Sequence, residues 1–283
     1  MHDDPFVCVT CGAHLPGSEA PPDVCRVCTD PRQYVGAHGQ RWLRHSELAR
    51  SHRTRVELID TDLWGVGVEP SFGIGQRALL VCAPEGNVLW DCVPLVDASG
   101  VALLEALGGV RTIAVSHPHF YTGVARWAEA LGAEVLLHAD DREHVQHPSE
   151  RIRHWQGERL ALPGGLTLVR GGGHYRGGTV LHWPAGADGR GVLLTGDIVQ
   201  VIPDKQHVGF MWSYPNLIPL PAPEVERVAA ALAPLAFDRL YGGWWDRVID
   251  AGAHEIVQRS AARYVQALQV RLDGPPLPWP EST

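Results

Sequence analysis

The sequence has no run of about eighteen apolar residues, the length that a membrane-spanning helix requires. Its first five residues (MHDDP) are acidic, whereas a secretory signal begins with basic residues and then turns apolar. Lysine and arginine form no clustered stripe, and 24 basic residues against 32 acidic ones give a formal net charge of -8. We therefore expect a cytosolic protein without a membrane span or an export signal, and no electrostatic capture of nucleic acid or anionic lipid.

The chain also lacks an internal repeat. Its 283 residues are 45% hydrophobic and 20% charged, which is typical of soluble globular proteins. The 31 glycines and 22 prolines indicate many short loops, and this composition favours a β-containing fold over a helical bundle.

Apolar periodicity and turn residues predict strands and helices in mixed order. The predicted strands are at 55–60, 77–82, 88–91, 111–115, 134–138, 166–170, 179–183 and 191–195. The predicted helices are at 101–107, 123–131, 222–235 and 253–272, and Gly132 is the expected C-cap of the second. This order predicts a layered α/β protein whose sheets pack together with helices outside.

Four of the six cysteines lie in the first 28 residues, and their spacing predicts a metal site. They form two pairs, Cys8-x2-Cys11 and Cys25-x2-Cys28, which together resemble a zinc ribbon. The first pair, followed by Gly12, also resembles half of a rubredoxin site. Two such pairs can place four thiolates around one tetrahedral ion. We predict zinc, with iron as an alternative, because thiolate spacing does not distinguish the two metals. A pair of disulfides is the other interpretation, and a reducing cytosol disfavours it.

The cysteine-rich segment is predicted to form a small module over residues 1–41, followed by the main domain over 42–283. A segment of about forty residues has little core of its own, so a bound ion would provide much of its folding free energy. The module is also a possible docking site for a protein partner. The remaining cysteines, Cys82 and Cys92, lie among apolar residues and are expected to be core side chains rather than ligands.

Three histidines and one aspartate follow predicted strands in a pattern that indicates a second metal site. His117 and His119 come directly after an apolar strand, and in an extended backbone residues i and i+2 point the same way. His174 lies in a glycine-rich loop, and Asp197 follows the strand that ends at Gly196. Three imidazoles and one carboxylate make a credible zinc ligand set.

At these residues the sequence resembles the metallo-β-lactamase-fold hydrolase superfamily. The family pattern is His-x-His-x-Asp-His after a strand, then a histidine in a glycine-rich loop, then Gly-Asp, and it matches from about Thr54 to Tyr241. The resemblance implies an αβ/βα sandwich of two packed mixed sheets with outer helices and a metal site in loops at one edge. It assigns His117, His119, His174 and Asp197 as ligands. It also implies that Asp91 orients one of the ligand imidazoles without binding the metal itself.

Two departures from the family pattern predict that most of a second metal site is missing. Tyr121 and Thr122 stand where the family has Asp and His, and Tyr241-Gly242-Gly243-Trp244 stands near its last histidine. Tyr121 therefore has three open roles: a weak ligand, a hydrogen-bond donor to a developing oxyanion, or a side chain that fills the vacated volume.

Two further segments are candidates for lining a substrate pocket. The aromatic stretch 210–216 (FMWSYPN) is one, although aromatic residues are more often core. His207 is a weaker candidate for entering the pocket from a loop.

The predicted function is that of a metal-dependent hydrolase acting on an ester, lactone, thioester, amide or phosphodiester. A zinc-bound hydroxide would be the nucleophile, Asp197 would complete the ligand set or act as a base, and Tyr121 would donate to the oxyanion. Two alternatives stay open: a scaffold that has lost its activity and docks through the cysteine module, and a rubredoxin-like redox partner. We expect one zinc in each site, with iron possible in either, and a small-molecule substrate.

Overall fold

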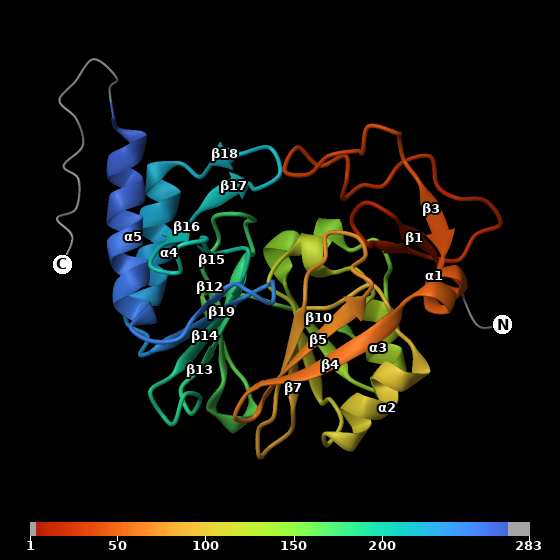
Figure 1. Cartoon of the computed structure of the whole chain (residues 1–283), viewed down its shortest axis with the longest axis horizontal. Coiled ribbons are helices and arrows are strands. Elements are labelled where there is room, and N and C mark those ends of the chain that lie inside the picture. Colours follow the sequence, from red (N-terminus) through yellow and green to blue (C-terminus); the bar gives the residue numbers. More distant parts are fainter. Residues whose placement is uncertain (1–3, 271–283) are drawn as a thin grey trace.

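Two mixed β-sheets packed face to face form the main body of the chain (Figure 1). The computed structural model describes residues 4–270. The first sheet has seven strands in the order β10-β9-β8-β7-β6-β5-β4. These strands are β4 (Arg53–Asp60), β5 (Leu63–Glu69), β6 (Ala78–Val81), β7 (Val88–Trp90), β8 (Thr112–Ala114), β9 (Glu134–His138) and β10 (Ile152–Trp155). Pairing is antiparallel from β4 to β7 and parallel from β7 to β10.

The second sheet has six strands in the order β11-β12-β13-β14-β19-β20. They are β11 (Arg159–Ala161), β12 (Thr167–Arg170), β13 (Thr179–Trp183), β14 (Val192–Gly196), β19 (Arg239–Gly242) and β20 (Val248–Ile249). Only β14 and β19 pair in parallel within it. Two hairpins follow β14 and lie beside its end. They are formed by β15 (Gln200–Val201) with β16 (Val208–Gly209), and by β17 (Met211–Ser213) with β18 (Ile218–Pro219).

Apolar side chains fill three layers. Between the sheets, Trp90 and Leu79 of the first sheet pack with Leu181 and Leu194 of the second. Helices α2 (Ala98–Ala106) and α3 (Val124–Leu131) cover the outer face of the first sheet, and α4 (Ala222–Leu232) and α5 (Ala253–Leu268) cover that of the second. Three short 3-10 helices lie in the loops, η1 (Pro118–Phe120), η2 (Ala139–His144) and η3 (Pro163–Gly165). The predicted α/β sandwich with outer helices is therefore confirmed.

The predicted helix at 123–131 is confirmed together with its glycine end. Gly132 has φ 65°, and its backbone N–H donates to the carbonyls of Ala128 and Glu129, as expected of a left-handed helix cap. The last helix ends earlier than expected, at Leu268, and positions 271 and 272 of that prediction lie outside the described residues. Within residues 4–270, no helix combines the length and the apolar character needed to cross a bilayer.

The cysteine-rich segment packs against the main body through a three-stranded sheet. Strand β1 (Phe6–Cys8) pairs with β2 (His14–Leu15) on one side and with β3 (Trp42–Arg44) on the other, and α1 (His45–Ser51) follows β3. The predicted domain boundary after residue 41 runs through this sheet. Dividing the chain there would separate β3 from β1, the strand with which it pairs. The division of the chain at that point stays a prediction.

Candidate metal centres

Four predicted ligands meet at one edge of the two sheets. They are His117, His119, His174 and Asp197, and one potential ligand atom from each lies within 4.8 Å of the others. The first two flank the start of η1 after β8, the third lies in the loop between β12 and β13, and the fourth directly follows β14. All four side chains are buried. The fold thus brings together residues that are up to 80 positions apart in the sequence.

Two of the imidazoles are held by hydrogen bonds at the nitrogen that faces away from the centre. His174 Nδ1 lies 3.0 Å from the carbonyl oxygen of Met211, which can only accept, so this nitrogen carries the proton. His119 Nε2 lies 2.9 Å from the hydroxyl of Tyr175. The opposite nitrogens, His174 Nε2 and His119 Nδ1, face each other at 3.2 Å. A second partner that fixes the tautomer in this way is the usual arrangement of metal-ligating histidines.

The third imidazole and the carboxylate have atoms that are buried without a hydrogen bond. His117 Nδ1 lies 2.8 Å from the hydroxyl of Ser116, and its Nε2 lies 3.4 Å from Asp197 Oδ2. His117 Nε2 and Asp197 Oδ1 have no hydrogen-bond partner. Because a buried polar atom without a partner is destabilising, these two atoms are the observation that fits a cation at this position.

The protonation states also fit a metal site. Burial lowers the pKa of His117 to about 3 and that of His174 to about 4, so both rings are neutral at neutral pH, as ligation requires. Burial also raises the pKa of Asp197 to about 6. A cation beside this carboxylate would reverse that effect, because it stabilises the ionised form. Three nitrogens and one oxygen match a zinc ligand set, and the identity of the metal stays a prediction.

Asp91 contacts Ser116, the residue that precedes His117. Its Oδ1 accepts a hydrogen bond of 2.7 Å from the backbone N–H of Ser116, whose hydroxyl contacts His117. Burial raises the pKa of Asp91 to about 7. Gly196 allows this packing, because a Cβ atom at that position would lie 2.3 Å from Ser116 Oγ. The role of Asp91 in orienting an imidazole stays a prediction.

An aromatic ring occupies the space beside Gly243. Phe120 is fully buried, with its ring centroid 4.5 Å from that of His117 and 5.8 Å from that of Trp244. A Cβ atom added to Gly243 would lie 2.9 Å from two carbons of the Phe120 ring. Tyr121 is buried in the apolar cluster on the outer face of the first sheet, where burial raises the pKa of its phenol well above the ordinary value. Its three open roles stay proposals.

Tyr175 and Arg32 were missed by the sequence reasoning. Tyr175 directly follows the predicted ligand His174, and this adjacency was the only feature of the sequence that pointed to it. The Arg32 guanidinium lies over the Tyr175 ring, 4.2 Å from its centroid, and forms an ion pair with Asp30. A residue of the cysteine-rich segment thus stacks on the tyrosine that contacts His119.

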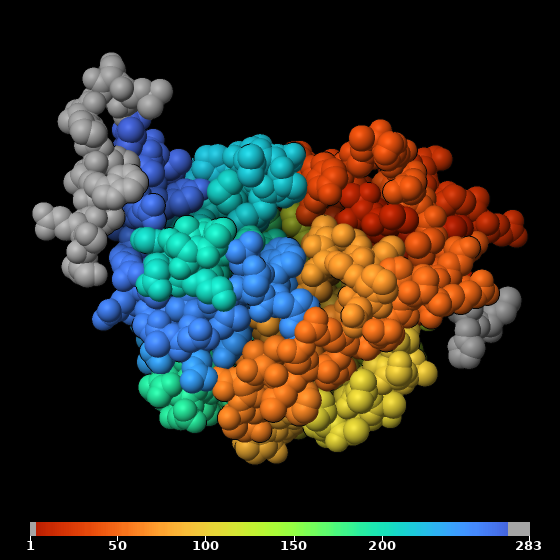
Figure 2. Space-filling view, in the orientation of Figure 1, coloured from red at the N-terminus to blue at the C-terminus, as the bar shows by residue number. Residues whose placement is uncertain are grey.

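The β17–β18 hairpin holds the cysteine-rich segment beside the histidine site through hydrogen bonds. The side-chain amide of Asn216 donates to the carbonyls of Pro31 and Gln33, both at 3.0 Å, and the hydroxyl of Ser213 donates to the carbonyl of Arg32 at 2.8 Å. In Figure 2 this hairpin, in cyan, abuts the red and orange N-terminal residues. The two candidate centres are therefore parts of one packed structure.

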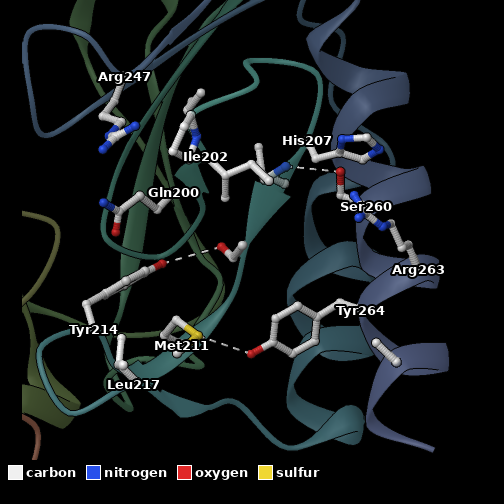
Figure 3. Close-up of a pocket in the computed structure, with 15 residues that line it drawn as sticks. Gln200, Ile202, His207, Met211, Tyr214, Leu217, Arg247, Ser260, Arg263 and Tyr264 are labelled. Atoms are coloured by element: carbon white, nitrogen blue, oxygen red, sulfur yellow. Dashed lines mark hydrogen bonds between the residues drawn. The ribbon is translucent and has the colours of Figure 1, made fainter. Parts of the chain in front are cut away.

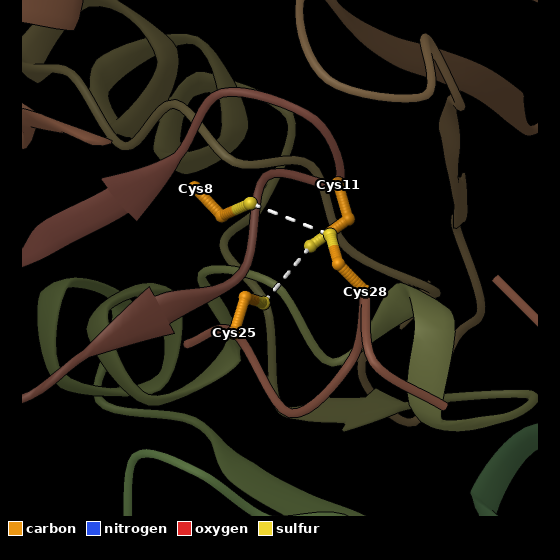
Figure 4. A group of neighbouring side chains, drawn as sticks. All are labelled: Cys8, Cys11, Cys25 and Cys28. Carbon is orange, nitrogen blue, oxygen red and sulfur yellow. Dashed lines mark hydrogen bonds between the residues drawn. The ribbon is translucent and has the colours of Figure 1, made fainter. Parts of the chain in front are cut away.

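The four N-terminal cysteines form the other candidate centre (Figure 4). The Sγ atoms of Cys8 and Cys28 lie 3.5 Å apart, and those of Cys11 and Cys25 lie 3.6 Å apart. Both separations far exceed a disulfide bond of about 2.05 Å. Hydrogen bonding to Cys25 and burial raise the pKa of the Cys11 thiol, and a bound cation would be needed to hold all four as thiolates.

The remaining predicted residues lie outside both groups. Cys92 is buried and Cys82 partly buried against the apolar cluster of the first sheet, as expected of core side chains. His207 pairs with Asp204 at 2.7 Å and lies outside the group of four ligands. It lines a neighbouring cavity together with Met211 and Tyr214, which belong to the aromatic stretch at 210–216.

Comparison with solved structures supports the fold. The DIM-1 metallo-β-lactamase aligns with a TM-score of 0.56 and 14% identity over 75% of this chain and 98% of that chain. A B3 metallo-β-lactamase with an active-site glutamic acid gives 0.53 and 19% identity over 85% and 96%. SMB-1 in a complex with mercaptoacetic acid gives 0.53 and 18% identity over 75% and 95%. The chain has the metallo-β-lactamase fold, and its His117/His119/His174/Asp197 group could hold a metal ion.

A relative in sequence defines the family more narrowly. The uncharacterized protein YmaE of Bacillus subtilis (strain 168) is 44% identical over 269 residues, which cover 94% of this chain and 98% of the relative. The chain belongs to the same family as YmaE. No family model matches the sequence.

Proposed function

We propose that the chain is a metal-dependent hydrolase with one metal ion at His117, His119, His174 and Asp197. The observation that carries this proposal is the orientation of the three imidazoles. Each has one nitrogen hydrogen-bonded to a neighbouring residue, and the other lies within 4.8 Å of the remaining ligand atoms. Three neutral, preorganised imidazoles can hold Zn²⁺ and leave further coordination positions for Asp197 or water.

Bound zinc would lower the pKa of a water molecule from about 16 to about 7, which supplies a hydroxide nucleophile at neutral pH. The side chains around this site have separate roles. Asp197 completes the ligand set or accepts a proton at Oδ1, the oxygen that has no hydrogen-bond partner. The Tyr214 hydroxyl donates to the backbone carbonyl of Asp197 at 3.1 Å and so fixes that residue from the side. Tyr121 fills volume or donates to a developing oxyanion.

The substrate class is an ester, lactone, thioester, amide or phosphodiester, all of which are open to attack by hydroxide. The three-histidine group favours a hydrolase over a scaffold, because an inactive scaffold has no need for buried, oriented ligands. It also disfavours a redox centre of the two-metal kind, because only one carboxylate belongs to the group within residues 4–270. We further propose a cytosolic location, which the free thiols of all six cysteines support.

The test compares His117→Ala with His38→Ala, a control at an exposed histidine in the N-terminal segment. Both variants and the parent protein are loaded with Zn²⁺, and metal content and hydrolysis of p-nitrophenyl acetate, a lactone, a thioester and bis-p-nitrophenyl phosphate are measured. We expect His117→Ala to lose one metal equivalent and all turnover while it keeps the ion in the cysteine site, which reports a folded protein. Turnover that survives in metal-free protein would contradict the proposal.

A further inference from the structure

A cavity of about 450 Å³ lies between the two hairpins that follow β14 and helix α5. Figure 3 shows Gln200 and Tyr214 on the strand side, with Arg263 and Tyr264 facing them from the helix. Its volume is within the range of about 300–1,000 Å³ that is usual for small-molecule sites.

Two residues are shared between this cavity and the histidine site. The Met211 carbonyl oxygen accepts the hydrogen bond from His174, and Met211 lines the cavity. The Tyr214 ring also lines it, and the centroid of this ring lies 5.7 Å from that of His174. One layer of side chains therefore separates the cavity from the proposed metal.

The lining is apolar with cationic groups and has no carboxylate. Aliphatic and aromatic side chains form most of it, and none of its lining residues is Asp or Glu, although the protein has a formal net charge of -8. Among its basic side chains, His207 lies 2.7 Å from Asp204, and Arg247 lies 3.7 Å from Asp246. Arg263 is exposed and forms no ion pair with any residue in the described range. An anion beside it would meet an uncompensated positive charge.

One apolar side chain that lines the same cavity is largely exposed to solvent. Leu217 is 78% exposed, the largest value among the exposed large hydrophobic side chains, and it lines the cavity from the turn between β17 and β18. Ile218 beside it is 41% exposed. Removing such a side chain from water when a ligand binds is favourable, because the hydrophobic effect grows with the apolar area that is buried.

We propose that this cavity is a separate binding site for a small amphipathic molecule with an apolar body and one anionic group. The apolar body lies against Leu217 and Tyr264, and the anionic group lies at Arg263. This inference goes beyond the proposed function, because one layer of side chains separates the cavity from the proposed metal ligands.

The test is equilibrium binding to the zinc-loaded full chain. Fluorescence of 8-anilino-1-naphthalenesulfonate, an aromatic anion, reports occupancy, and decanoate is used to displace it. Decyltrimethylammonium has a similar tail and the opposite charge. We expect decanoate to displace the dye at concentrations about tenfold lower than the cation does, since one favourable and one unfavourable charge contact differ by about 1.4 kcal/mol or more.

Two exposed substitutions test the lining without disturbing the core. We expect Arg263→Glu and Leu217→Asp each to weaken decanoate binding about tenfold. The matched control is Arg50→Glu, which makes the same charge change on α1, on the other side of the molecule from α5 (Figure 1). This control is expected to bind decanoate like the parent.

Two results would overturn the inference. One is decanoate binding by Arg263→Glu that equals that of Arg50→Glu, and the other is cation binding as tight as anion binding. Because the readout is binding, the inference and the proposed function fail separately. Loss of binding selectivity with intact metal-dependent turnover rejects the cavity, whereas selective binding without any metal-dependent turnover rejects the hydrolase and leaves the cavity inference intact.

Discussion

Replacing Gly243 with alanine tests whether the Phe120 ring fills the space beside this glycine. The added Cβ atom would lie 2.9 Å from Cε2 and Cζ of Phe120, whereas non-bonded carbons prefer about 3.5–4.0 Å. The Phe120 ring cannot withdraw easily, because it is fully buried between the rings of His117 and Trp244. We expect Gly243→Ala to lower the free energy of unfolding by about 1–3 kcal/mol, as overpacking usually does.

A double-mutant cycle separates this clash from other effects of the substitution. Leucine at position 120 lacks the outer ring carbons, so Gly243→Ala should be less destabilising in a Phe120→Leu background, by about 1 kcal/mol or more. Urea denaturation of the zinc-loaded proteins measures all four free energies. Additive effects of the two substitutions, or a neutral Gly243→Ala, would show that the ring does not occupy this volume.

Three further perturbations follow from the contacts of the two centres. Tyr175→Phe removes the hydroxyl beside His119 Nε2 and should weaken zinc binding at the histidine site about 10- to 100-fold in a chelator competition; unchanged affinity would exclude a positioning role. Zinc affinity of the histidine site should fall as the pH is lowered through about 6, because Asp197 becomes protonated in the metal-free protein whereas the imidazoles stay neutral. Titration calorimetry across pH 5–8 measures this affinity. An affinity that rises on acidification would contradict the prediction. Asn216→Ala removes two hydrogen bonds to the cysteine-rich segment and should lower the unfolding free energy by about 1 kcal/mol, with an unchanged denaturation midpoint as the opposing result.

The sequence located most of the buried strands and the longer helices, because periodicity records which face each element buries. Strand β5 (Leu63–Glu69), which carries Gly65 and Gly67 and so departs from a typical strand pattern, was not predicted. Strand 134–138 and strand 179–183 have the predicted bounds. The short strands after Asp197 were not predicted. Each is only two or three residues long, so it carries no period, and its pairing depends on where the chain returns.

The candidate site was predictable only where the residue type itself carries chemistry. Histidines after strand ends and paired cysteines could be recognised as ligands from their residue type and spacing. The contacts of Tyr175, Met211 and Arg32 could not be predicted in this way. A tyrosine hydroxyl, a backbone carbonyl and an arginine acquire a role only through residues that the fold brings beside them. The docking of the cysteine-rich segment on the β17–β18 hairpin is likewise a contact between residues more than 180 positions apart.

Metal content per chain tests the central claim most directly. Element analysis of the full chain, of His174→Ala and of Cys11→Ser separates the two centres without cutting the β1–β3 sheet. The account predicts two ions in the parent, with one lost in each variant and the other retained. A parent protein whose metal content does not change on His174→Ala would contradict the claim that the three imidazoles and Asp197 hold a metal ion.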